Sequence, residues 1–550
     1  MPHVLVYGSD HLAFRIIEQL CAEGRSVSVI ASPGSWLARA DLPQGARAVT
    51  VACEQGAEAA LLQATHIEEV ETLFAVTDRD EANLGLTLAA LELNSRLRVV
   101  LRQFNVRLGR LLEEYLPRCE VMSMSTLAAP TFALAARAPG VRFAHELGCD
   151  IFVLREANAK ERQTIDASSF ASAKSRVVLA VEGETLHWFP PPDFEFGADA
   201  KLLVASTERE LPAYPPPAQN ALAAKSPLSW RTQRILFAVI AYLLFVVICA
   251  SVYFRFRLGM SALDAVYFVI TTITSVGFGD FSLREADALS KIVGILLMIS
   301  GVGITAVFFA LITNSLIARQ QAFEQGQVRQ RISDHTIVCG LGVVGLRVAQ
   351  KLQEQGERVV CVEKREDNRF LAEARRLRIP VVIGDALQEQ TLRYANIAQA
   401  RSLVVCSNPD NLNLEIALNA RSLREGLPVV LRMFDPDLAR RVAHHFKLDA
   451  TFSSAALVAA RFAAHATGST RLFNLQFHDH SFDVHQVSVT AGEEIAGVCK
   501  RHDGEQVAAV DAQGRLRFDV ETREPFQQTS MLILSQTTQD STVSKNRVTN

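Results

Sequence analysis

The sequence has little of what marks several other classes of protein. Its nine cysteines form no CxxC pair and are scattered along 550 residues, so we expect a reduced, cytosolic environment and no disulfide scaffold. Its 56 basic residues are outnumbered by 59 acidic ones, and the net charge of -3 argues against a nucleic-acid partner. The first residues lack the basic segment of a signal peptide, so we expect the N-terminal region to fold in the cytosol.

Signatures of enzymatic chemistry are missing as well. We find no nucleophile elbow, no P-loop and no paired carboxylates in a setting that supports catalysis, so we expect the chain not to be an enzyme. The mean hydropathy of +0.15 is high for a soluble protein and low for one that lies mostly in a membrane. A chain of this length predicts three or four domains, and a few apolar spans within a large folded mass would explain the mean.

Two segments are long and apolar enough to cross a membrane. Residues 235–254 carry no charge, and neither do residues 292–318. About 20 such residues span a bilayer as a helix, whereas soluble helices average about 11–12 residues. We therefore predict two spans, at 235–254 and 288–318, in a cell or inner membrane. Two spans return the chain to its starting side, so we expect both termini in the cytoplasm.

The segment between the spans carries the most specific motif. Ser261 and Asp264 form a capping box that opens a predicted helix over residues 261–272. Residues 274–280 follow, with glycine in alternate positions. Such alternation lets successive backbone carbonyls point the same way, and four copies would form rings of oxygens that replace the water around a potassium ion. The predicted filter consists of Thr274, Ser275, Val276, Gly277, Phe278, Gly279 and Asp280.

This motif resembles the selectivity filter of potassium channels, whose pattern is T-V-G-Y-G-D, and the order of span, helix, filter and span resembles the two-helix members of that family. Ser275 keeps the hydroxyl of the usual threonine, whereas Phe278 lacks the phenol of the usual tyrosine. The resemblance implies a homotetramer in a lipid bilayer that conducts K+. Gly301 and Gly303 in the second span are candidates for a gating hinge, although small residues equally serve close packing of membrane helices.

A nucleotide-binding pattern follows the second span. Residues 335–339 form a predicted strand, and Gly340, Gly342 and Gly345 follow as G-x-G-x-x-G before a predicted helix. Glycines in this pattern allow a tight turn and let a phosphate approach the start of the helix. Glu363 ends the next predicted strand, where it could accept hydrogen bonds from ribose hydroxyls. We expect a small nucleotide ligand, either an adenine nucleotide or NAD(H).

The alternating strands and helices of residues 334–468 predict a parallel sheet of Rossmann type. This region resembles the regulator-of-potassium-conductance domain (RCK, TrkA-N-like), which also occurs in subunits that gate potassium transporters. The resemblance implies a regulatory nucleotide site bordered by the loops after the third and fourth strands. Pattern and resemblance together predict contacts from Gly340, Gly342, Val343, Val344, Gly345, Glu363, Lys364, Gly384, Asp385, Ala386, Ser407 and Asn408.

The first 140 residues repeat this pattern but have lost its binding chemistry. Where the second copy has Gly342, Glu363 and Gly384-Asp385, the first has Asp10, Ala31 and Ala52-Cys53. Asp10 puts a carboxylate where a phosphate would lie. We therefore expect the first copy to be structural, and a cation bound at Asp10 or at Asp78 and Asp80 is the weaker alternative.

The predicted fold class is α/β, with two Rossmann-type cytosolic domains, each with a small α+β C-terminal lobe, on either side of an all-α pore domain. The predicted boundaries are 1–140 for the degenerate RCK lobe, 141–210 for its C-terminal lobe, 211–232 for a Pro-rich linker, 233–318 for the pore domain, 319–333 for a connector, 334–468 for the nucleotide-binding RCK lobe, 469–537 for its C-terminal lobe and 538–550 for a disordered tail.

We therefore predict a potassium channel gated by a nucleotide that binds a cytosolic ring of RCK domains. A membrane-anchored NAD-dependent oxidoreductase and a regulatory subunit of a potassium transporter are the alternatives. A cluster of histidines near the C-terminus could hold a divalent cation, but a polar loop explains it better. The cluster contains His478, His480 and His485, with Asp479 and Asp483 nearby. We expect His145 to lie on the surface.

Overall fold

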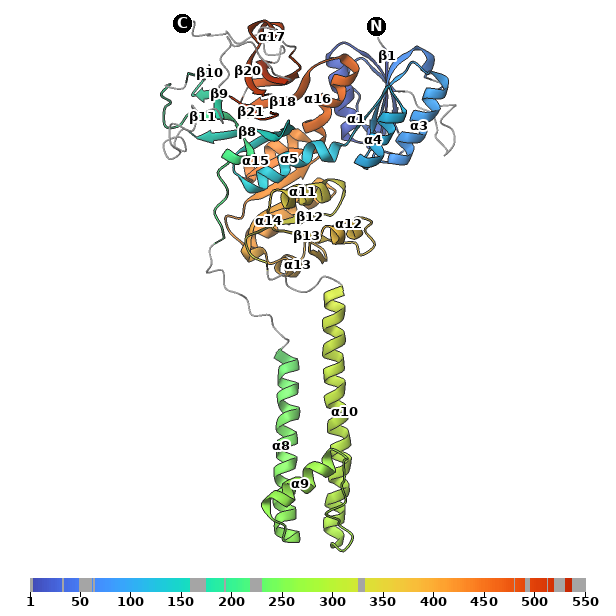
Figure 1. Cartoon of the computed structure of the whole chain (residues 1–550), viewed down its shortest axis with the longest axis vertical. Helices are drawn as coiled ribbons and strands as arrows, with labels where there is room; N and C mark the ends of the chain where they lie inside the picture. The colour runs from blue at the N-terminus through green and yellow to red at the C-terminus, as the bar shows by residue number, and fades with distance from the viewer. Residues whose placement is uncertain are drawn as a thin grey trace. The chain divides into compact units, whose positions relative to one another are not determined.

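A computed structural model shows the fold of most of the chain (Figure 1). The described residues are 3–31, 34–48, 62, 65–158, 175–191, 194–217, 230–324, 332–478, 480–489, 495–511, 513–518 and 530–536. Several predicted features lie outside the described residues. They are Ala52, Cys53, Asp479, residues 218–229 of the linker, residues 325–331 of the connector and the tail at 538–550.

The N-terminal region forms a parallel sheet of six strands. Strand β1 (His3–Gly8) is buried along Val4, Leu5 and Val6, as expected for a strand covered by helices on both faces. The other strands are β2 (Ser26–Ala31), β3 (Ala46–Ala48), β4 (Val70–Ala75), β5 (Arg98–Arg102) and β6 (Cys119–Met122), and the order is β3-β2-β1-β4-β5-β6. The helices are α1 (His11–Ala22), α3 (Asp80–Leu93), α4 (Val106–Tyr115) and α5 (Met124–Arg137).

A second parallel sheet repeats the first. Its strands are β12 (His335–Cys339), β13 (Val359–Glu363), β14 (Val381–Ile383), β15 (Ala400–Val405), β16 (Val429–Met433) and β17 (Ala450–Ser453), in the order β14-β13-β12-β15-β16-β17. The helices are α11 (Val343–Glu354), α12 (Leu371–Arg376), α13 (Glu389–Tyr394), α14 (Asp410–Leu423), α15 (Pro436–Phe446) and α16 (Ser454–Thr467). The identical strand order confirms the internal repeat and the Rossmann-type fold.

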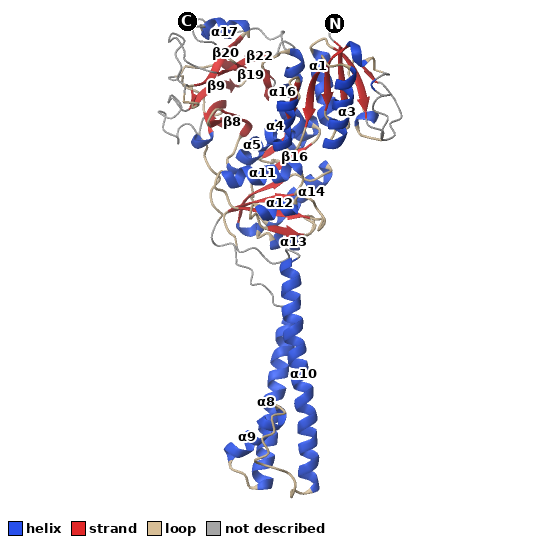
Figure 2. Cartoon of the chain, turned by 45° about the vertical axis from the view of Figure 1, so that its right-hand side comes forward, coloured by secondary structure: helices blue, strands red, loops and turns tan. Residues whose placement is uncertain are grey.

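Each parallel sheet is followed by an antiparallel one, which belongs to a small lobe (Figure 2). The first small lobe contains β7 (Val141–Leu147), β8 (Asp150–Asn158), β9 (Ser175–Glu182), β10 (Thr185–Trp188) and β11 (Lys201–Thr207). The second contains β18 (Arg471–Phe477), β19 (His480–Val487), β20 (Gly504–Val510), β21 (Leu516–Arg517), β22 (Ser530–Gln536) and helix α17 (Ile495–Arg501). The two small lobes have the same strand order, because β7-β8-β11-β9-β10 corresponds strand for strand to β18-β19-β22-β20-β21.

The two copies pack against each other within one compact unit. Helix α5 of the first copy packs on α11 of the second, and α1 packs on α16. Phe143 and Phe473, each the third residue of its strand, stack with their ring centroids 4.3 Å apart and their planes 5° apart. Equivalent residues that stack on one another indicate a local two-fold relation between the copies. One hydrophobic core therefore runs through both copies.

A chain of charged side chains joins the end of α5 to the start of the second copy. Arg401 binds Asp334 through two hydrogen bonds of 2.8 and 2.6 Å, and it also donates to Glu357 at 2.8 Å. Arg137, the last residue of α5, lies 3.5 Å from Glu357. The backbone carbonyl of Arg137 also accepts from Tyr214 N at 2.9 Å, just before the linker. The segments that precede and follow residues 220–329 are thus both connected to the end of helix α5.

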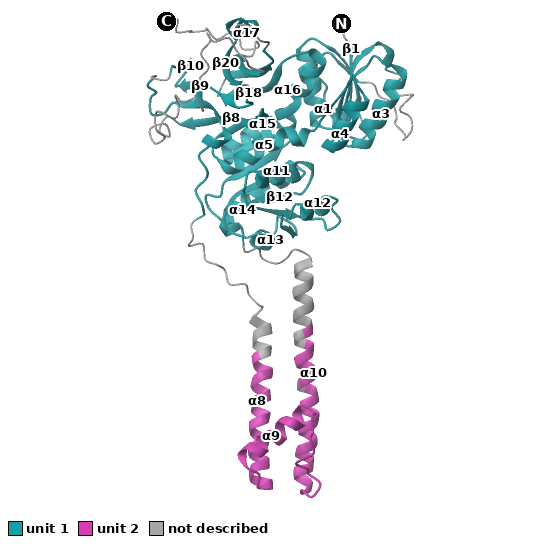
Figure 3. Cartoon of the chain, in the orientation of Figure 1, with its two compact units in different colours: residues 1–219, 330–550 teal, residues 220–329 magenta. Residues whose placement is uncertain are grey.

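The remaining compact unit, residues 220–329, is all helical where the structure describes it (Figure 3). Its helices are α8 (Trp230–Leu258), α9 (Ala262–Ile273) and α10 (Ala288–Glu324). The segments 237–258 and 288–310 are long and apolar enough to cross a membrane. Around Phe254, which is fully buried against Phe268, the three helices form a small core, whereas most outward apolar side chains are exposed.

Candidate functional site

The short helix α9 begins where the capping box predicts. Ser261 Oγ accepts a hydrogen bond from Asp264 N at 3.2 Å and donates to the Asp264 carboxylate at 2.7 Å. At the other end, Thr274 Oγ1 donates to Ile270 O at 2.8 Å, which closes the last turn. The carbonyl of Thr271 then accepts from Val276 N and Gly277 N, at 3.0 and 3.2 Å. These bonds fix the start of the predicted filter against its helix.

The backbone of the predicted filter alternates in handedness. Ser275, Gly277 and Gly279 have φ angles of 58°, 53° and 86°, whereas Val276 and Phe278 between them stay outside the left-handed region. This alternation turns successive peptide units so that their carbonyl oxygens can face one side, as a ring of oxygen ligands requires. Glycine adopts positive φ without cost, but Ser275 does so with a Cβ atom.

Tyr267 on α9 supplies a contact that the sequence did not reveal. Its hydroxyl donates to the Asp280 carboxylate at 3.0 Å, and its ring stacks on Phe278 with centroids 6.4 Å apart. A phenol is therefore present behind the predicted filter, although it comes from the helix and not from position 278. The only sequence signal was a tyrosine six residues before the end of the helix at Ile273.

The two candidate hinge glycines have different surroundings. A Cβ atom at Gly301 would lie 2.6 Å from the carbonyl oxygen of Ile273, so the bare backbone there lets α10 approach the end of α9. A Cβ atom at Gly303 would meet nothing within 4 Å. Helix α10 runs through both positions. The contact gives Gly301 a packing role, and the hinge stays a prediction.

The loop between β12 and α11 has the geometry of a phosphate-binding turn. Gly340 has a φ of 90°, and a Cβ there would lie 2.5 Å from Ser407 Oγ. A Cβ at Gly345 would lie 2.0 Å from the carbonyl oxygen of Gly340, so both outer glycines are required for packing. A Cβ at Gly342 would meet nothing within 4 Å. Gly342 caps α11 without a side chain, and the space beside it is open, so an anion can approach the helix start here.

Glu363 is buried and already held by the backbone. Its two carboxylate oxygens accept from Leu341 N and Arg365 N, both at 2.9 Å. Asn368 Nδ2 donates to the Leu341 carbonyl at 3.0 Å and adds to the same turn. Each carboxylate oxygen keeps further acceptor capacity, which fits a ribose diol. Glu363 therefore joins the glycine loop to the end of β13.

The neighbouring charged residues are paired with one another. Lys364 Nζ lies 2.8 Å from Asp385 Oδ2, and Arg365 forms an exposed pair with Asp367. Burial would raise the pKa of Asp385, but the hydrogen bonds from Lys364 and from Leu387 N hold that pKa below its ordinary value. A Cβ at Gly384 would lie 2.8 Å from Thr391 Oγ1, so that loop is tightly packed, and Ala386 beyond it is buried.

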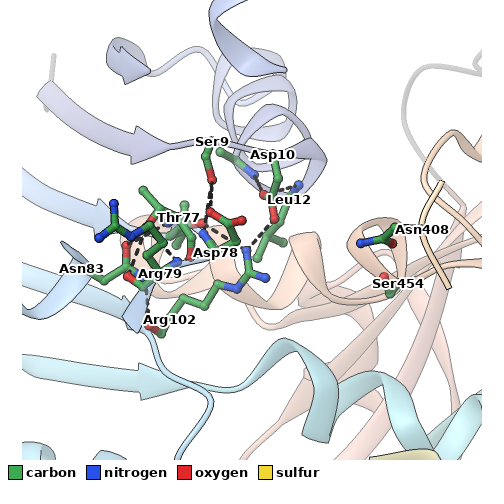
Figure 4. Close-up of polar contacts among 12 residues, drawn as sticks. Ser9, Asp10, Leu12, Thr77, Asp78, Arg79, Asn83, Arg102, Asn408 and Ser454 are labelled. Atoms are coloured by element: carbon green, nitrogen blue, oxygen red, sulfur yellow. Dashed lines mark hydrogen bonds and ion pairs between the residues drawn. The ribbon is translucent and has the colours of Figure 1, made fainter. Parts of the chain in front are cut away.

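The loop after the fourth strand is held the same way in both copies. Asn413 Nδ2 donates to Ser407 O and Arg432 O at 2.9 and 2.8 Å. In the first copy, Asn83 Nδ2 donates to Thr77 O and Arg102 O at 3.0 and 3.1 Å (Figure 4). Two of the predicted contact residues lie in this loop. Ser407 lies against Gly340, where a Cβ atom would be 2.5 Å from Ser407 Oγ. Asn408 Oδ1 accepts from Arg432 Nη1 at 3.3 Å.

In the first copy, the Asp10 carboxylate occupies the position at the start of helix α1. The Asp10 carboxylate accepts from Leu12 N at 3.0 Å and Ala13 N at 3.5 Å, which caps α1. Arg102 reaches the same carboxylate from the end of β5, with Nη1 2.6 Å from Oδ2 (Figure 4). Asp78, a residue of the alternative cation site, accepts from Ser9 Oγ at 2.9 Å. The expected carboxylate is present, and it is satisfied by protein donors.

The histidine predictions have mixed outcomes. His485 bonds Thr470 Oγ1 and Ser535 Oγ, and no group of three or more metal-ligating side chains occurs among the described residues. The prediction that His145 lies on the surface is wrong: it is buried and lies 2.9 Å from an Arg461 nitrogen. Burial lowers the pKa of His145 to about 3, so the ring is neutral beside the guanidinium.

Comparisons with known proteins match both the parallel-sheet regions and the helical region of the chain. The TrkA-N domain family matches residues 4–116 and again 336–453, and the ion channel family matches residues 241–318. The first TrkA-N match covers β1 to β5 of the first parallel sheet, and the second covers β12 to β17 of the second. The ion channel match covers α9 and the predicted filter.

Two curated relatives are archaeal. An uncharacterized protein of Methanothermus fervidus is 31% identical over 214 residues, which are 38% of this chain and 32% of the relative. Probable potassium channel protein 2 of Methanocaldococcus jannaschii is 26% identical over 201 residues, 34% of this chain and 55% of the relative. The chain thus matches about a third of the first relative's length and about half of the second's.

A solved structure shares the fold. The crystal structure of the GsuK RCK domain is 14% identical, covers 98% of this chain and 94% of its own, and has a TM-score of 0.50. The family matches and the two sheets confirm the predicted domain types. The chain therefore carries two TrkA-N domains, one on either side of a region that matches the ion channel family.

Proposed function

We propose that this chain is one quarter of a homotetrameric, potassium-selective pore that is gated by a nucleotide in the second TrkA-N domain. The alternating backbone of Ser275, Gly277 and Gly279 carries the proposal, because four such segments around an axis supply stacked rings of carbonyl oxygens. Residues 274–280 follow a capped helix between two apolar helices, which is the order a pore loop needs. The name of the archaeal potassium channel relative supports the same ion.

The nucleotide part of the proposal depends on the loop 340–345. Its open position at Gly342, the N-terminus of α11 and the buried Glu363 carboxylate suit a phosphate and a ribose of one ligand. When bound, an adenine nucleotide or NAD(H) acts as an effector. It shifts the gate only through a difference in affinity between the open and closed states. In this arrangement both termini lie in the cytoplasm.

Potassium flux from the purified chain tests the pore. We expect liposomes that contain only this chain to release potassium in preference to sodium, and a nucleotide to change the rate. Empty liposomes supply the background. Potassium flux no faster than that background, with and without nucleotides, would contradict the channel. A regulatory transporter subunit would give that result, whereas an oxidoreductase would instead turn over NAD(H).

Ligand binding tests the second domain separately. We expect Glu363→Ala to weaken binding of ADP or NADH at least tenfold, because the variant loses the ribose acceptor and frees the backbone donor Leu341 N. Glu373→Ala, an exposed glutamate paired with Arg376 on α12, is the control and should bind as the original chain does. A thermal-shift titration of the full chain measures both. An unchanged midpoint shift in Glu363→Ala would refute this site.

A further inference from the structure

Asp10 and Gly342 occupy the same position in the two copies but differ in one group. Each caps the helix that follows the first strand of its sheet. Asp10 has φ and ψ of -132° and -174°, and Gly342 has -94° and -166°, so both have the same extended backbone. At the capping residue itself, the two turns differ by the Asp10 side chain. The space that the Asp10 side chain fills in the first copy is open at Gly342 in the second.

The donors around the Asp10 carboxylate define an anion position. Leu12 N and Ala13 N donate from the first turn of α1, and Arg102 Nη1 lies 2.6 Å from the carboxylate. The first copy therefore shows where a negative group lies on this fold and which side chain neutralises it. A carboxylate and a phosphate call for the same donors.

The second copy keeps every donor of that set. Val344 N and Gly345 N take the places of the two backbone donors in the first turn of α11. Arg432 takes the place of Arg102, because Asn413 holds its carbonyl as Asn83 holds that of Arg102. Whereas Arg102 pairs with a carboxylate in its own copy, Arg432 donates to the neutral oxygens of two other residues. These are Asn408 Oδ1 at 3.3 Å and Ser454 Oγ at 3.2 Å.

We propose that Arg432 binds a phosphate of the nucleotide at the start of α11, where Asp10 places its carboxylate in the first copy, and that Asp10 is a built-in anion that excludes nucleotide from the first copy. This inference rests on the proposed nucleotide site. It makes the phosphate part of what the site recognises, so a nucleoside such as adenosine is not an equivalent ligand. Lys364 does not take this role, because it pairs with Asp385 beyond the ribose end.

Direct binding measurements on the full chain in detergent test Arg432. We expect Arg432→Gln to weaken ADP binding at least tenfold and to leave adenosine binding unchanged, since adenosine has no phosphate. Arg102→Gln is the matched control, because it removes the equivalent arginine of the first copy, and it should bind ADP as the original chain does. Equal loss of ADP and adenosine binding, or ADP binding unchanged in Arg432→Gln, would overturn the proposal.

A transplanted carboxylate gives a second test that does not depend on removing a side chain. Gly342→Asp gives α11 the cap of α1, and both the open space and the extended backbone accommodate it. We expect this variant to fold, as judged by its melting temperature, and to lose ADP binding. Gly342→Asn has the same shape without the charge and should retain more ADP binding. Full ADP binding by Gly342→Asp would refute the shared anion position.

Failure of the nucleotide site and failure of the role of Arg432 give different results. If the original chain binds neither ADP nor adenosine, the proposed nucleotide site is wrong and Arg432 has no ligand there. If the original chain binds ADP and Arg432→Gln binds it equally well, only the role of Arg432 is wrong.

Discussion

Replacing Gly277 by alanine is expected to reduce potassium flux to the level of empty liposomes while nucleotide binding stays unchanged. Gly277 has a φ of 53°, a conformation that costs a residue with a Cβ atom about 1–2 kcal/mol. In the proposed tetramer each of the four chains has this cost at the same level of the filter. A filter that relaxes away from this backbone no longer points its carbonyl oxygens at the ion. Flux and ADP titration of the same preparation give both readouts.

Gly259 provides a matched control for that substitution. It has a φ of 68°, lies between α8 and α9, and has nothing within 4 Å of a Cβ atom. Gly259→Ala therefore imposes a similar local strain outside the predicted filter and should leave potassium flux near that of the original chain. Equal flux from the two variants would contradict the assignment of residues 274–280 as the filter. Loss of ADP binding in Gly277→Ala would point to misfolding.

Replacing Arg401 by methionine is expected to lower the free energy of unfolding more than replacing the exposed Arg376 does. Its guanidinium is 18% exposed and neutralises Asp334 and Glu357, whose side chains are 36% and 12% exposed. Arg401→Met leaves the Asp334 carboxylate without its guanidinium partner and leaves Glu357 with only Arg137, 3.5 Å away. Breaking a buried pair costs 3–5 kcal/mol, so for this partly exposed set we expect about 2–4 kcal/mol, measured as a lower urea midpoint of unfolding.

The controls for Arg401→Met separate burial from charge. Arg376→Met removes an exposed pair with Glu373 and should cost about 1 kcal/mol or less. Adding Asp334→Asn to Arg401→Met should restore part of the loss, because the carboxylate that has lost its guanidinium is then neutral while Glu357 keeps Arg137. An equal urea midpoint for Arg401→Met and Arg376→Met would refute the role of the network.

The pH dependence of the Arg401 effect follows from Asp334. The hydrogen bonds from Arg401 hold the pKa of Asp334 below its ordinary value of about 3.9. A carboxylate with a lowered pKa in the folded state stabilises that state above the unfolded pKa, and the contribution fades as pH falls through the folded pKa. The difference in free energy of unfolding between the original chain and Arg401→Met should therefore be largest at neutral pH and should decrease below about pH 4.

Features carried by a short stretch of sequence were predictable. The capping box at Ser261 and the glycine loop 340–345 each follow from neighbouring residues, because a cap or a tight turn uses local hydrogen bonds. The repeat of one pattern in both halves implied that the two parallel sheets share a strand order, although not which order it is. The carboxylate at Asp10 was visible because its counterpart in the second copy is a glycine.

Contacts between distant residues were not predictable in this way. Arg102 lies 92 positions after Asp10, and Arg461 lies 316 positions after His145, so no spacing pattern connects either pair. The pairing of the two copies brings Arg461 onto a histidine that looked solvent-facing in its own segment. The contact of Tyr267 with Asp280 is short in sequence, but its direction depends on how the loop folds back over α9.

Because Asp10 belongs to the chain, it cannot dissociate. A free ligand leaves its site when its concentration falls, whereas a tethered group stays at a fixed effective concentration. The first copy therefore remains in one state at every level of nucleotide, and only the second copy titrates. Saturation should then require one nucleotide per chain and four per tetramer. In the proposed tetramer, the Hill coefficient of gating by nucleotide cannot then exceed four, although eight domains of the same fold would be present.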